Sequence, residues 1–270
     1  MEGKKTPLNV VKVGGAVVED PRSLESLLQQ FAALPGHKVL VHGGGRRATD
    51  IARRLGIESV MVGGRRVTDL EMLKVVTMVY GGLINKDVVA KLQARGVNAI
   101  GLTGADMDVI RSHRRPTTRM VLEDGMERDV DFGFVGDVDR ADAQALDALI
   151  GNGMTPVVAP LTHDGEGNML NTNADTIAST VACALASLYD VTLTFCFEKR
   201  GVLENPDCDD CVIKRIDKTL YSQLKADHVV AGGMIPKLDN AFQALERGVG
   251  RVVITSAGNV DGSMGTTICP

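Results

Sequence analysis

The stretch VLVHGGGRRATDIARRL (residues 39–55) decides the fold, because an apolar run stops at three glycines and a helical pattern follows at once. Its first three residues predict a buried strand, and the spacing of apolar residues in its second half predicts an amphipathic helix. Gly43, Gly44 and Gly45 therefore occupy a strand-to-helix turn. Backbone N–H groups in such a turn approach a ligand closely, and the start of the helix adds positive charge, so the turn suits an anion such as phosphate. The alternative is that these glycines bind no ligand and are present because a tight turn needs residues with positive φ.

A second glycine turn follows the apolar run 8–13, where Lys12 lies close to Gly14 and Gly15. Lys12 is either a phosphate-binding lysine or a solvated lysine at the end of a strand. Pro21 then begins a predicted helix, so strands and helices alternate and imply an α/β fold with a mainly parallel sheet and right-handed crossovers. Open parallel sheets bind ligands at the carboxyl ends of their strands, and both glycine turns lie at such ends, so they can share one ligand.

Composition and motifs exclude several classes of protein. The 270 residues fit one large α/β domain or two closely joined lobes. With 30 Lys and Arg against 34 Asp and Glu, no Trp and 3% aromatic residues, the chain lacks the basic excess and the stacking residues typical of nucleic-acid binding. No apolar run is long enough to span a bilayer and no signal peptide is recognised, so we expect a cytoplasmic protein. Neither glycine turn matches the P-loop or the dinucleotide motif GxGxxG, which disfavours a P-loop kinase and a nicotinamide dehydrogenase.

The five cysteines include one close pair, Cys208 and Cys211 in NPDCDDCV. A single CxxC without a second pair or a nearby His is a weak metal signal, so we predict a surface turn there and assign no metal ligand. A chain of this length can bury its core without metals or disulfides.

The segment VMVGGRRVT predicts a hairpin that projects from the sheet. It carries Arg65 and Arg66, and an arginine at such a rim is either solvated or grips a carboxylate in two places. Helical spacing follows over residues 70–93, with an expected break at Gly81-Gly82. Short apolar groups between charged and turn residues predict small strands over 107–139, which we interpret as a flap or rim.

Polar side chains gather in two further places. Asn171, Asn173 and Asp175 surround the start of a predicted helix, where Asn173 is expected to cap the helix and Asp175 suits its first turn. A carboxylate near a lysine-rich phosphate site can also orient the lysines, so both roles stay open for Asp175. Lys237 lies in the first turns of another predicted helix, after Gly232-Gly233, where the helix dipole disfavours a cation. It is a functional lysine or an ordinary surface lysine.

Taken together, these segments resemble the amino acid kinase family. The matching segments recur in the same order over nearly the whole chain. They are VKVGGAV (11–17), VLVHGGG (39–45), RRVTD (65–69), GGLINK (81–86), GFVGDV (133–138), PVVAPL (156–161), NTNADTIA (171–178) and GGMIPKLDNA (232–241). No single segment is decisive, but HGGG, RVT, NxNAD and GGMxxK in that order form a specific set.

The resemblance implies a three-layer α/β/α sandwich around a mainly parallel open sheet. It implies one kinase domain over residues 1–270, with an N-terminal lobe (about 1–170) for acyl-glutamate binding and dimerisation and a C-terminal lobe (about 171–270) for ATP. The implied reaction is ATP-dependent phosphorylation of the side-chain carboxylate of an N-acylated glutamate, in arginine biosynthesis. Acetyl is the first choice for the acyl group, and the arginine-rich SHRRPTTR leaves a charged acyl such as succinyl as the alternative.

The resemblance also implies catalytic roles for three residues. Lys12 matches the lysine that faces the transferred phosphoryl group, Lys237 matches the lysine on the ADP side, and Asp175 matches the carboxylate that holds both lysines. A carboxylate nucleophile is already ionised at neutral pH, so the reaction needs donors around the phosphate and no general base.

Ligand contacts are implied for other residues. The backbone N–H groups expected to cradle the phosphates belong to Gly14, Gly15, Gly44 and Gly45. Gly44 and Gly45 are also expected to face the substrate. Mg²⁺ is expected to neutralise the nucleotide oxygens. Arg66 matches the residue that grips the α-carboxylate of the substrate, and Asn171 matches a neighbour that contacts its backbone.

Two further expectations concern assembly and nucleotide recognition. Arginine-inhibited relatives carry an additional N-terminal helix, by which dimers join into a hexamer. In this chain the first strand starts at about Leu8, which leaves no room for that helix. We therefore expect a homodimer that is insensitive to arginine. Glu198, in FCFEKRG, stands near the position where the family commonly has an aspartate, so adenosine recognition is expected to differ in detail.

Two rival functions remain at the level of the sequence. Kinases of the same fold that act on aspartate, glutamate, carbamate or UMP should lack the Arg66 and Asn171 pair in this context. A non-catalytic nucleotide-binding regulator would keep the fold but lose a phosphate lysine or Asp175. The chain keeps all of these residues.

Overall fold

A central sheet of eight strands organises the computed structural model, which describes residues 5–121, 125–205 and 207–270. The strands of this sheet are β1 (Thr6–Val13), β2 (His37–His42), β5 (Ala99–Leu102), β10 (Thr155–Val158), β13 (Tyr189–Phe197), β14 (Arg215–Ile216), β15 (Arg251–Ser256) and β16 (Thr266–Ile268). Their order is β14-β16-β15-β13-β1-β2-β10-β5, and every neighbouring pair is parallel except β15 with β16. The predicted α/β fold around a mainly parallel sheet is confirmed.

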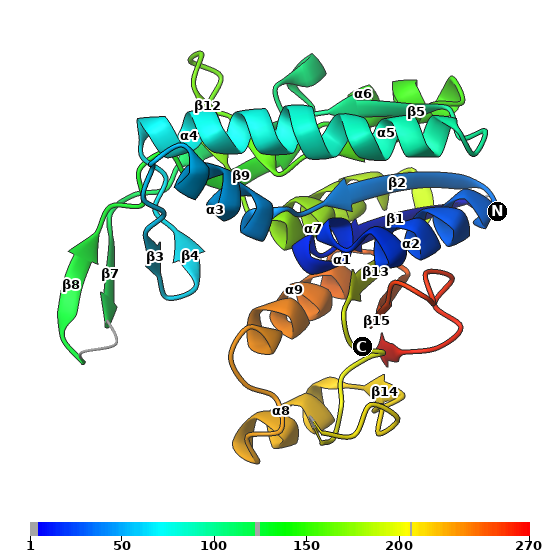
Figure 1. Cartoon of the computed structure of the whole chain (residues 1–270). Helices are drawn as coiled ribbons and strands as arrows, with labels where there is room; N and C mark the ends of the chain where they lie inside the picture. Colours follow the sequence, from blue (N-terminus) through cyan, green and yellow to red (C-terminus); the bar gives the residue numbers. More distant parts are fainter. Residues whose placement is uncertain (1–4, 122–124, 206) are drawn as a thin grey trace.

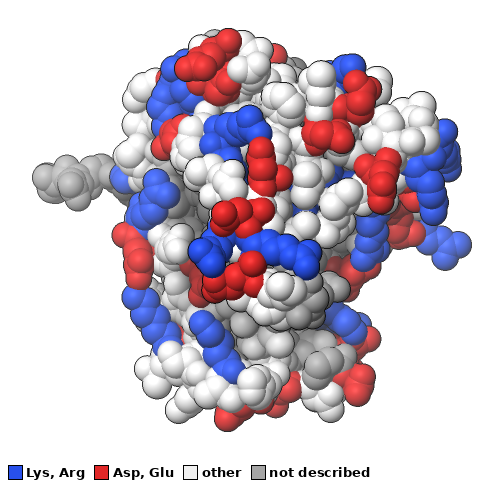
Figure 2. Space-filling model, turned by 90° about the vertical axis from the view of Figure 1, so that its left-hand side faces the viewer, with Lys and Arg blue, Asp and Glu red and all other residues white. Residues whose placement is uncertain are grey.

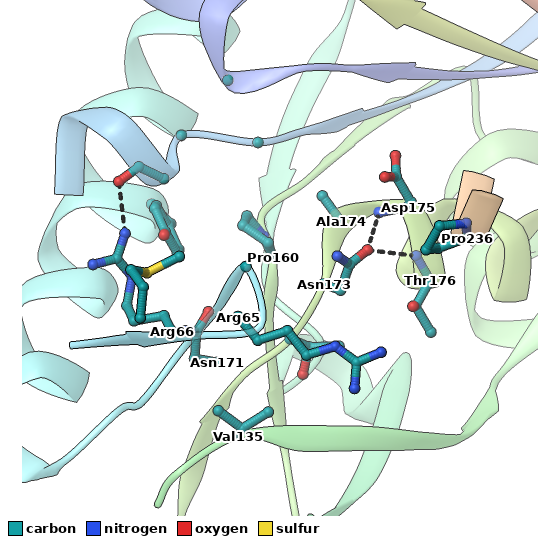
Figure 3. A pocket seen from close by; sticks show the side chains of 18 of the residues that line it. Arg65, Arg66, Val135, Pro160, Asn171, Asn173, Ala174, Asp175, Thr176 and Pro236 are labelled. Carbon is teal, nitrogen blue, oxygen red and sulfur yellow. Dashed lines mark hydrogen bonds between the residues drawn. The ribbon is translucent and has the colours of Figure 1, made fainter. Parts of the chain in front are cut away.

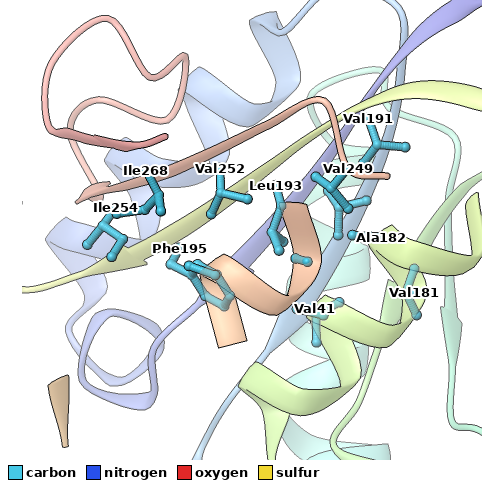
Figure 4. Packing of buried hydrophobic residues seen from close by; sticks show 14 of the residues in the cluster. Val41, Val181, Ala182, Val191, Leu193, Phe195, Val249, Val252, Ile254 and Ile268 are labelled. Atoms are coloured by element: carbon cyan, nitrogen blue, oxygen red, sulfur yellow. The ribbon is translucent and has the colours of Figure 1, made fainter. Parts of the chain in front are cut away.

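Helices cover both faces of this sheet (Figure 1). They are α1 (Gly15–Glu19), α2 (Pro21–Ala33), α3 (Gly45–Arg54), α4 (Leu70–Val76), α5 (Asn85–Gln93), α6 (Ala143–Gly151), α7 (Ala174–Leu185), α8 (Lys218–Ala226) and α9 (Met234–Glu246). Because successive side chains of a strand point to opposite faces, Val10 of β1 belongs to one buried cluster and Val11 to another. In the first cluster, Leu193 and Phe195 of β13 lie with Val181 of α7 (Figure 4). The chain is the three-layer sandwich that was expected.

A smaller sheet and two hairpins lie beside the central sheet. The smaller sheet contains β6 (Ile110–Arg114), β9 (Gly136–Ala141), β11 (Leu161–His163) and β12 (Met169–Asn171), in the order β12-β11-β6-β9. A short 3-10 turn, η2 (Asp106–Asp108), precedes β6. The hairpins, on the same side of the molecule (Figure 1), are β3 (Met61–Val62) with β4 (Arg65–Arg66) and β7 (Thr118–Val121) with β8 (Glu127–Val130).

These elements confirm the hairpin predicted in VMVGGRRVT and the small strands predicted over 107–139. Residues 122–124 of the predicted flap lie outside the described part of the chain. The two hairpins are close to each other, since a Cβ atom added to Gly63 would lie 3.0 Å from Cε of Met120.

The expected break at Gly81-Gly82 is wrong. Helix α4, a π-helical segment η1 (Thr77–Ile84) and α5 follow one another without interruption. A glycine inside a helix costs roughly 1 kcal/mol relative to alanine. Val79, Tyr80 and Ile84 are buried and hold the segment against the core, so tertiary packing outweighs this local preference. Such π-helical turns often occur at functional sites.

Candidate functional site

The two glycine turns meet at the carboxyl ends of the central strands β1 and β2. Val13 pairs with His42 across these strands, and the N–H of Gly43 donates to Val13 O at 2.9 Å. A Cβ atom added to Gly15 would lie 3.2 Å from the backbone nitrogen of Gly44, so the turns approach closely because they lack side chains. The parallel sheet therefore brings both turns to one place, as the sequence predicted.

Lys12, Asp175 and Lys237 converge next to these turns. Lys12 Nζ, near the end of β1, lies 2.7 Å from Asp175 Oδ1, and Lys237 Nζ, on α9, lies 2.7 Å from Asp175 Oδ2. Asp175 is in the first turn of α7, and Asn173 caps that helix because its Oδ1 accepts hydrogen bonds from the N–H groups of Asp175 and Thr176. The capping prediction is confirmed, and Asp175 also forms an ion pair with each lysine.

Burial and charge act in opposite directions on this cluster. Burial lowers the pKa of the Lys12 ammonium, and the neighbouring Asp175 carboxylate offsets this only in part. Burial on its own would raise the pKa of Asp175, but Lys12 and Lys237 outweigh it and hold that pKa below its ordinary value. With both lysines protonated, the ionised carboxylate leaves one excess positive charge, which suits a phosphate ligand.

A cavity of about 390 Å³ opens beside Asp175 (Figure 3). Of the predicted site residues, those that line it are Gly15, Gly44, Gly45, Arg66, Asn171 and Asp175. Lys12 and Lys237 are not lining residues and adjoin the cavity through Asp175. Gly14 does not fit the expectation of a free phosphate-binding N–H, because its N–H donates to Cys196 O of β13 at 2.9 Å. That hydrogen bond continues the parallel ladder one residue beyond β1.

Arg66 is held in place at the wall of the cavity. Its Nη2 donates to Gly45 O at 2.8 Å and to Thr49 Oγ1 at 2.9 Å, and its Nη1 donates to Ser59 Oγ. Tyr80, from the π-helical segment, lies beside it: burial raises the pKa of the Tyr80 phenol and Arg66 opposes that rise. The guanidinium is therefore oriented by the helix that follows the glycine turn.

Asn171 lies at the end of β12 on the same cavity. Its Nδ2 donates to Thr68 Oγ1 at 2.9 Å, and its backbone N–H donates to Phe134 O at 2.8 Å. The second bond continues the contact between β12 and the strand-like segment around Val135, which also lines the cavity. These bonds tie the smaller sheet to the segment that follows the hairpin.

Several other residues line the cavity besides the predicted site residues. Arg65, Tyr80 and Arg115 all line the cavity, and Figure 3 shows Arg65 and Arg66 extending in different directions from β4. Arg115 is paired with Asp137, with Nη2 2.5 Å from Oδ1. Arg65 has no carboxylate within ion-pair distance among the residues that the structure describes. The pair RR in the hairpin was a signal for Arg65, whereas nothing in the local sequence singled out Tyr80.

Three features outside the cavity bear on earlier expectations. Glu198 lies 3.7 Å from Arg46, at the start of α3, and both side chains are exposed. Cys208 and Cys211 form a disulfide in the predicted turn. Within the described ranges, no group of three or more His, Cys, Asp or Glu side chains is arranged to hold a metal ion, and no helix is long and apolar enough to cross a bilayer.

The face of the molecule that carries the hairpins has mixed charge. Figure 2 shows Lys and Arg alternating with Asp and Glu over this face. Nucleic-acid-binding surfaces typically carry a patch or stripe of positive charge, and this face does not match that pattern.

The fold and the site define a phosphoryl-transfer enzyme of the amino acid kinase class, and the comparison with known sequences agrees. The model of the amino acid kinase family matches residues 7–256, so the chain belongs to this family. Among similar curated proteins, the acetylglutamate kinase of Bacteroides thetaiotaomicron is 60% identical over 261 residues, which cover 97% of this chain and 98% of that protein. The acetylglutamate kinase of Methanopyrus kandleri is 39% identical, covering 97% of this chain and 100% of that protein.

Solved structures support the same fold. The crystal structure of smu.665 from Streptococcus mutans has a TM-score of 0.77 at 28% identity and covers 97% of this chain and 98% of that chain. The N-acetylglutamate synthase of Neisseria gonorrhoeae has a TM-score of 0.77 at 22% identity and covers 99% of this chain but 60% of that chain, so it shows the fold alone.

Proposed function

We propose that this chain phosphorylates the side-chain carboxylate of N-acetyl-L-glutamate with ATP, giving an acyl phosphate in arginine biosynthesis. The observation that carries the proposal is the Lys12–Asp175–Lys237 cluster, whose two 2.7 Å ion pairs place two ammonium groups beside the glycine turns. The sequence identity to curated acetylglutamate kinases supports the choice of acceptor.

Each group has a distinct part in the proposed reaction. Lys12 neutralises the transferred phosphoryl group, Lys237 neutralises the leaving phosphate of ADP, and Asp175 holds both lysines in position. The N–H groups of Gly15, Gly44 and Gly45 donate to phosphoryl oxygens. Phosphoryl transfer is accelerated mainly by positioning and charge stabilisation, which is what this cluster provides.

The acceptor occupies the arginine side of the cavity in this proposal. Arg66 grips its α-carboxylate in two places, and Asn171 contacts its backbone. The side-chain carboxylate then faces the glycine turns, ionised and ready to attack. The N-terminal lobe, about 1–170, supplies the acceptor pocket, and the C-terminal lobe, about 171–270, binds ATP, because Arg66 and Lys237 come from these two halves of the chain.

Mg²⁺ is expected to enter with the nucleotide. It is commonly bound through substrate phosphates together with one or two carboxylates. Asp175 is the carboxylate among the described residues that line the cavity, and both of its oxygens face lysines. The protein side chains therefore do not fit a Mg²⁺ ligand set, and we derive no step through the ion.

Arg65 favours a second acceptor, N-succinyl-L-glutamate. It lines the cavity and has no carboxylate partner within ion-pair distance among the described residues. A succinyl group would carry a carboxylate to this guanidinium, whereas an acetyl group would not. The Arg65→Gln variant separates the two acceptors, since it should impair turnover of the succinyl substrate and leave that of the acetyl substrate nearly unchanged.

The test of the proposed function is an acyl-phosphate trapping assay with hydroxylamine, ATP and Mg²⁺. The acceptors are N-acetyl-L-glutamate, N-succinyl-L-glutamate, glutamate and aspartate, and Lys12→Ala serves as the inactive control. We expect hydroxamate from an N-acyl glutamate and none from the free amino acids. Absence of hydroxamate from both N-acyl glutamates, or preference for a free amino acid, would overturn the proposal.

We also propose a cytoplasmic homodimer insensitive to arginine. Leu70, Met78 and Leu83 expose between 46% and 56% of their surface along the continuous helix from α4 to α5, and a second copy of the chain would cover them. Light scattering tests the mass, and the Met78→Glu variant should yield monomers. A hexamer, or inhibition of the kinase by added arginine, would contradict this assembly.

A further inference from the structure

His42 and Asn85 form a buried polar pair behind the glycine turn that follows β2. His42 is the last residue of β2, and Asn85 is the first residue of α5, where the π-helical segment ends. His42 Nδ1 lies 2.9 Å from Gly43 O, and His42 Nε2 lies 3.2 Å from Asn85 Nδ2. Asn85 Nδ2 also donates to Val157 O of β10 at 2.9 Å. The pair therefore connects the glycine turn to a helix and to a neighbouring strand.

These partners determine the protonation of the imidazole. A carbonyl oxygen only accepts hydrogen bonds, so Nδ1 carries the proton and donates to Gly43 O. Asn85 Nδ2 is a donor in its bond to Val157 O, so His42 Nε2 accepts from the same amide. Burial lowers the pKa of His42 to about 4, and the bond to Gly43 O opposes this shift. His42 is therefore neutral near pH 7, with both ring nitrogens engaged.

The bond from His42 fixes the peptide that joins Gly43 and Gly44. In a trans peptide the C=O and N–H groups point in opposite directions, so a Gly43 carbonyl held by the imidazole turns the N–H of Gly44 away from it. Gly44 N–H has no acceptor among the described residues, and its nitrogen borders the space next to Gly15. This is the space between the two turns.

The π-helical segment constrains the same turn from its other side. Gly44 has a φ of 154°, and a Cβ atom at this residue would lie 2.3 Å from Cδ1 of Ile84. Ile84 is directly followed by Asn85, so one helical turn excludes side chains from the glycine turn and anchors His42. The end of the π-helical segment thus places Ile84 against Gly44 and Asn85 against His42.

We propose that His42 and Asn85 are positioning residues, in which a neutral imidazole held by Asn85 aims the N–H of Gly44 at the transferred phosphoryl group. This inference rests on the proposed kinase function. Donors aligned in advance stabilise charge on the phosphoryl oxygens in the transition state. Neither side chain lines the cavity, so their loss should lower kcat far more than it raises the KM for the acyl glutamate.

Four variants separate the two hydrogen bonds of the imidazole. His42→Asn keeps a donor near the Nδ1 position, His42→Gln keeps a polar group near the Nε2 position, His42→Leu removes both, and Asn85→Ala removes only the amide. We expect kcat to fall by roughly tenfold to a hundredfold in His42→Leu and His42→Gln, and by less in His42→Asn and Asn85→Ala. Thr255→Val is the matched control, because it removes a buried hydroxyl that donates to Met264 O at 2.8 Å, and neither residue lines the cavity.

The readouts distinguish failure of this proposal from failure of the proposed function. The wild-type enzyme is assayed first, and absence of acyl phosphate there counts against the kinase function. The affinity for a nonhydrolysable ATP analogue, which keeps the γ-phosphoryl group, still tests the pair when measured by calorimetry: it should weaken in His42→Leu and be restored in His42→Asn. Folding of each variant is checked by circular dichroism.

Two outcomes overturn the positioning role. One is a folded His42→Leu or His42→Gln variant with the kcat and the ATP-analogue affinity of the wild type. The other is an equal loss in His42→Asn and His42→Leu, which would show that only packing matters. If the His42 variants do not fold, Asn85→Ala decides: a lower kcat at an unchanged KM supports the proposal, and a wild-type kcat rejects it.

Discussion

Lys12 Nζ lies 2.7 Å from Asp175 Oδ1, although one residue is near the end of the first strand and the other begins a helix in the second half of the chain. Both side chains are largely buried, with 9% and 13% of their surface exposed. A buried ion pair has its greatest effect when one member is removed, because the other charge is then left without its partner. Three predictions follow from this pair.

Lys12→Ala should abolish most of the phosphoryl transfer. We expect a loss of about a hundredfold or more in kcat, because a preorganised charge at the transferred group is removed. Lys237→Ala should act in the same direction. Steady-state kinetics with the preferred acyl glutamate measure the loss, and Lys91→Ala, whose ammonium pairs with Asp87 on α5, is the control. A Lys12→Ala enzyme with wild-type kcat would contradict the assigned role.

The pH profile of the wild-type enzyme should reflect Lys12. Burial lowers the pKa of this ammonium from its ordinary value of 10.5, so deprotonation begins at a lower pH than for a solvated lysine. Because the protonated form is the active one, kcat should fall as pH rises through the lowered pKa. A profile of kcat against pH tests this, and a limb that reaches its half-maximum only at pH 10.5 would show that Lys12 keeps an ordinary pKa.

Asp175→Asn should impair stability as well as catalysis. Loss of the carboxylate leaves the buried Lys12 ammonium next to Lys237 without a counter-charge, and breaking a buried pair of this kind costs about 3 kcal/mol. Urea unfolding measures the change in the free energy of unfolding. The double variant Lys12→Met with Asp175→Asn should recover part of it, and failure to recover any would argue against the ion pair as the cause.

Arg66→Lys should raise the KM for the acyl glutamate by roughly tenfold to a hundredfold with a smaller effect on kcat. A lysine cannot reproduce the planar two-point contact with a carboxylate, and it cannot make the three bonds to Gly45, Thr49 and Ser59. Arg119→Lys is the matched control, because Arg119 lies on the β7–β8 hairpin and is 71% exposed beside Glu127. An unchanged KM in Arg66→Lys would place the acceptor elsewhere.

Acid should destabilise the protein through His42. Burial lowers the pKa of this residue to about 4, below the ordinary value of 6.5. Between these two pH values His42 is protonated in the unfolded chain but neutral in the folded chain. Its contribution to stability is therefore complete above pH 6.5 and is lost as the pH falls towards 4, by about 3 kcal/mol in total.

Urea unfolding at several pH values, for the wild type and for His42→Asn, measures this contribution. The variant lacks the titrating group, so the difference in unfolding free energy between the two proteins should change with pH between 6.5 and 4. Parallel curves for the two proteins would show that His42 does not carry this pH dependence.

The sequence predicted those features that depend on local patterns. The parallel sheet follows from alternating strands and helices, and the meeting of the turns at Gly15 and Gly44 follows from the rule that parallel strands end at one edge. The cap at Asn173 is equally local. Contacts between distant parts of a chain leave no local pattern in the sequence. The expectation that Lys12 and Lys237 share Asp175 therefore came from the family resemblance alone.

Other features could not be predicted for physical reasons. The helix continues through Gly81-Gly82 because burial of Tyr80 and Ile84 outweighs the local preference of glycine, and burial depends on the tertiary structure. The N–H of Gly14 is taken by Cys196 O, which depends on the register between β1 and β13. This register is set by pairing between two segments that are far apart in the sequence, so neither segment predicts it alone.

The central place of β1 in the sheet has a consequence for synthesis on the ribosome. β1 and its neighbour β2 lie close together in the sequence, but the other neighbour of β1, β13, begins only at Tyr189. Until then β1 lacks a neighbour on one edge, and Lys237, on α9, follows later still. A chain that ends before α9 therefore carries Lys12 and Asp175 but not Lys237, so the three-residue charge cluster can form only when translation is nearly complete.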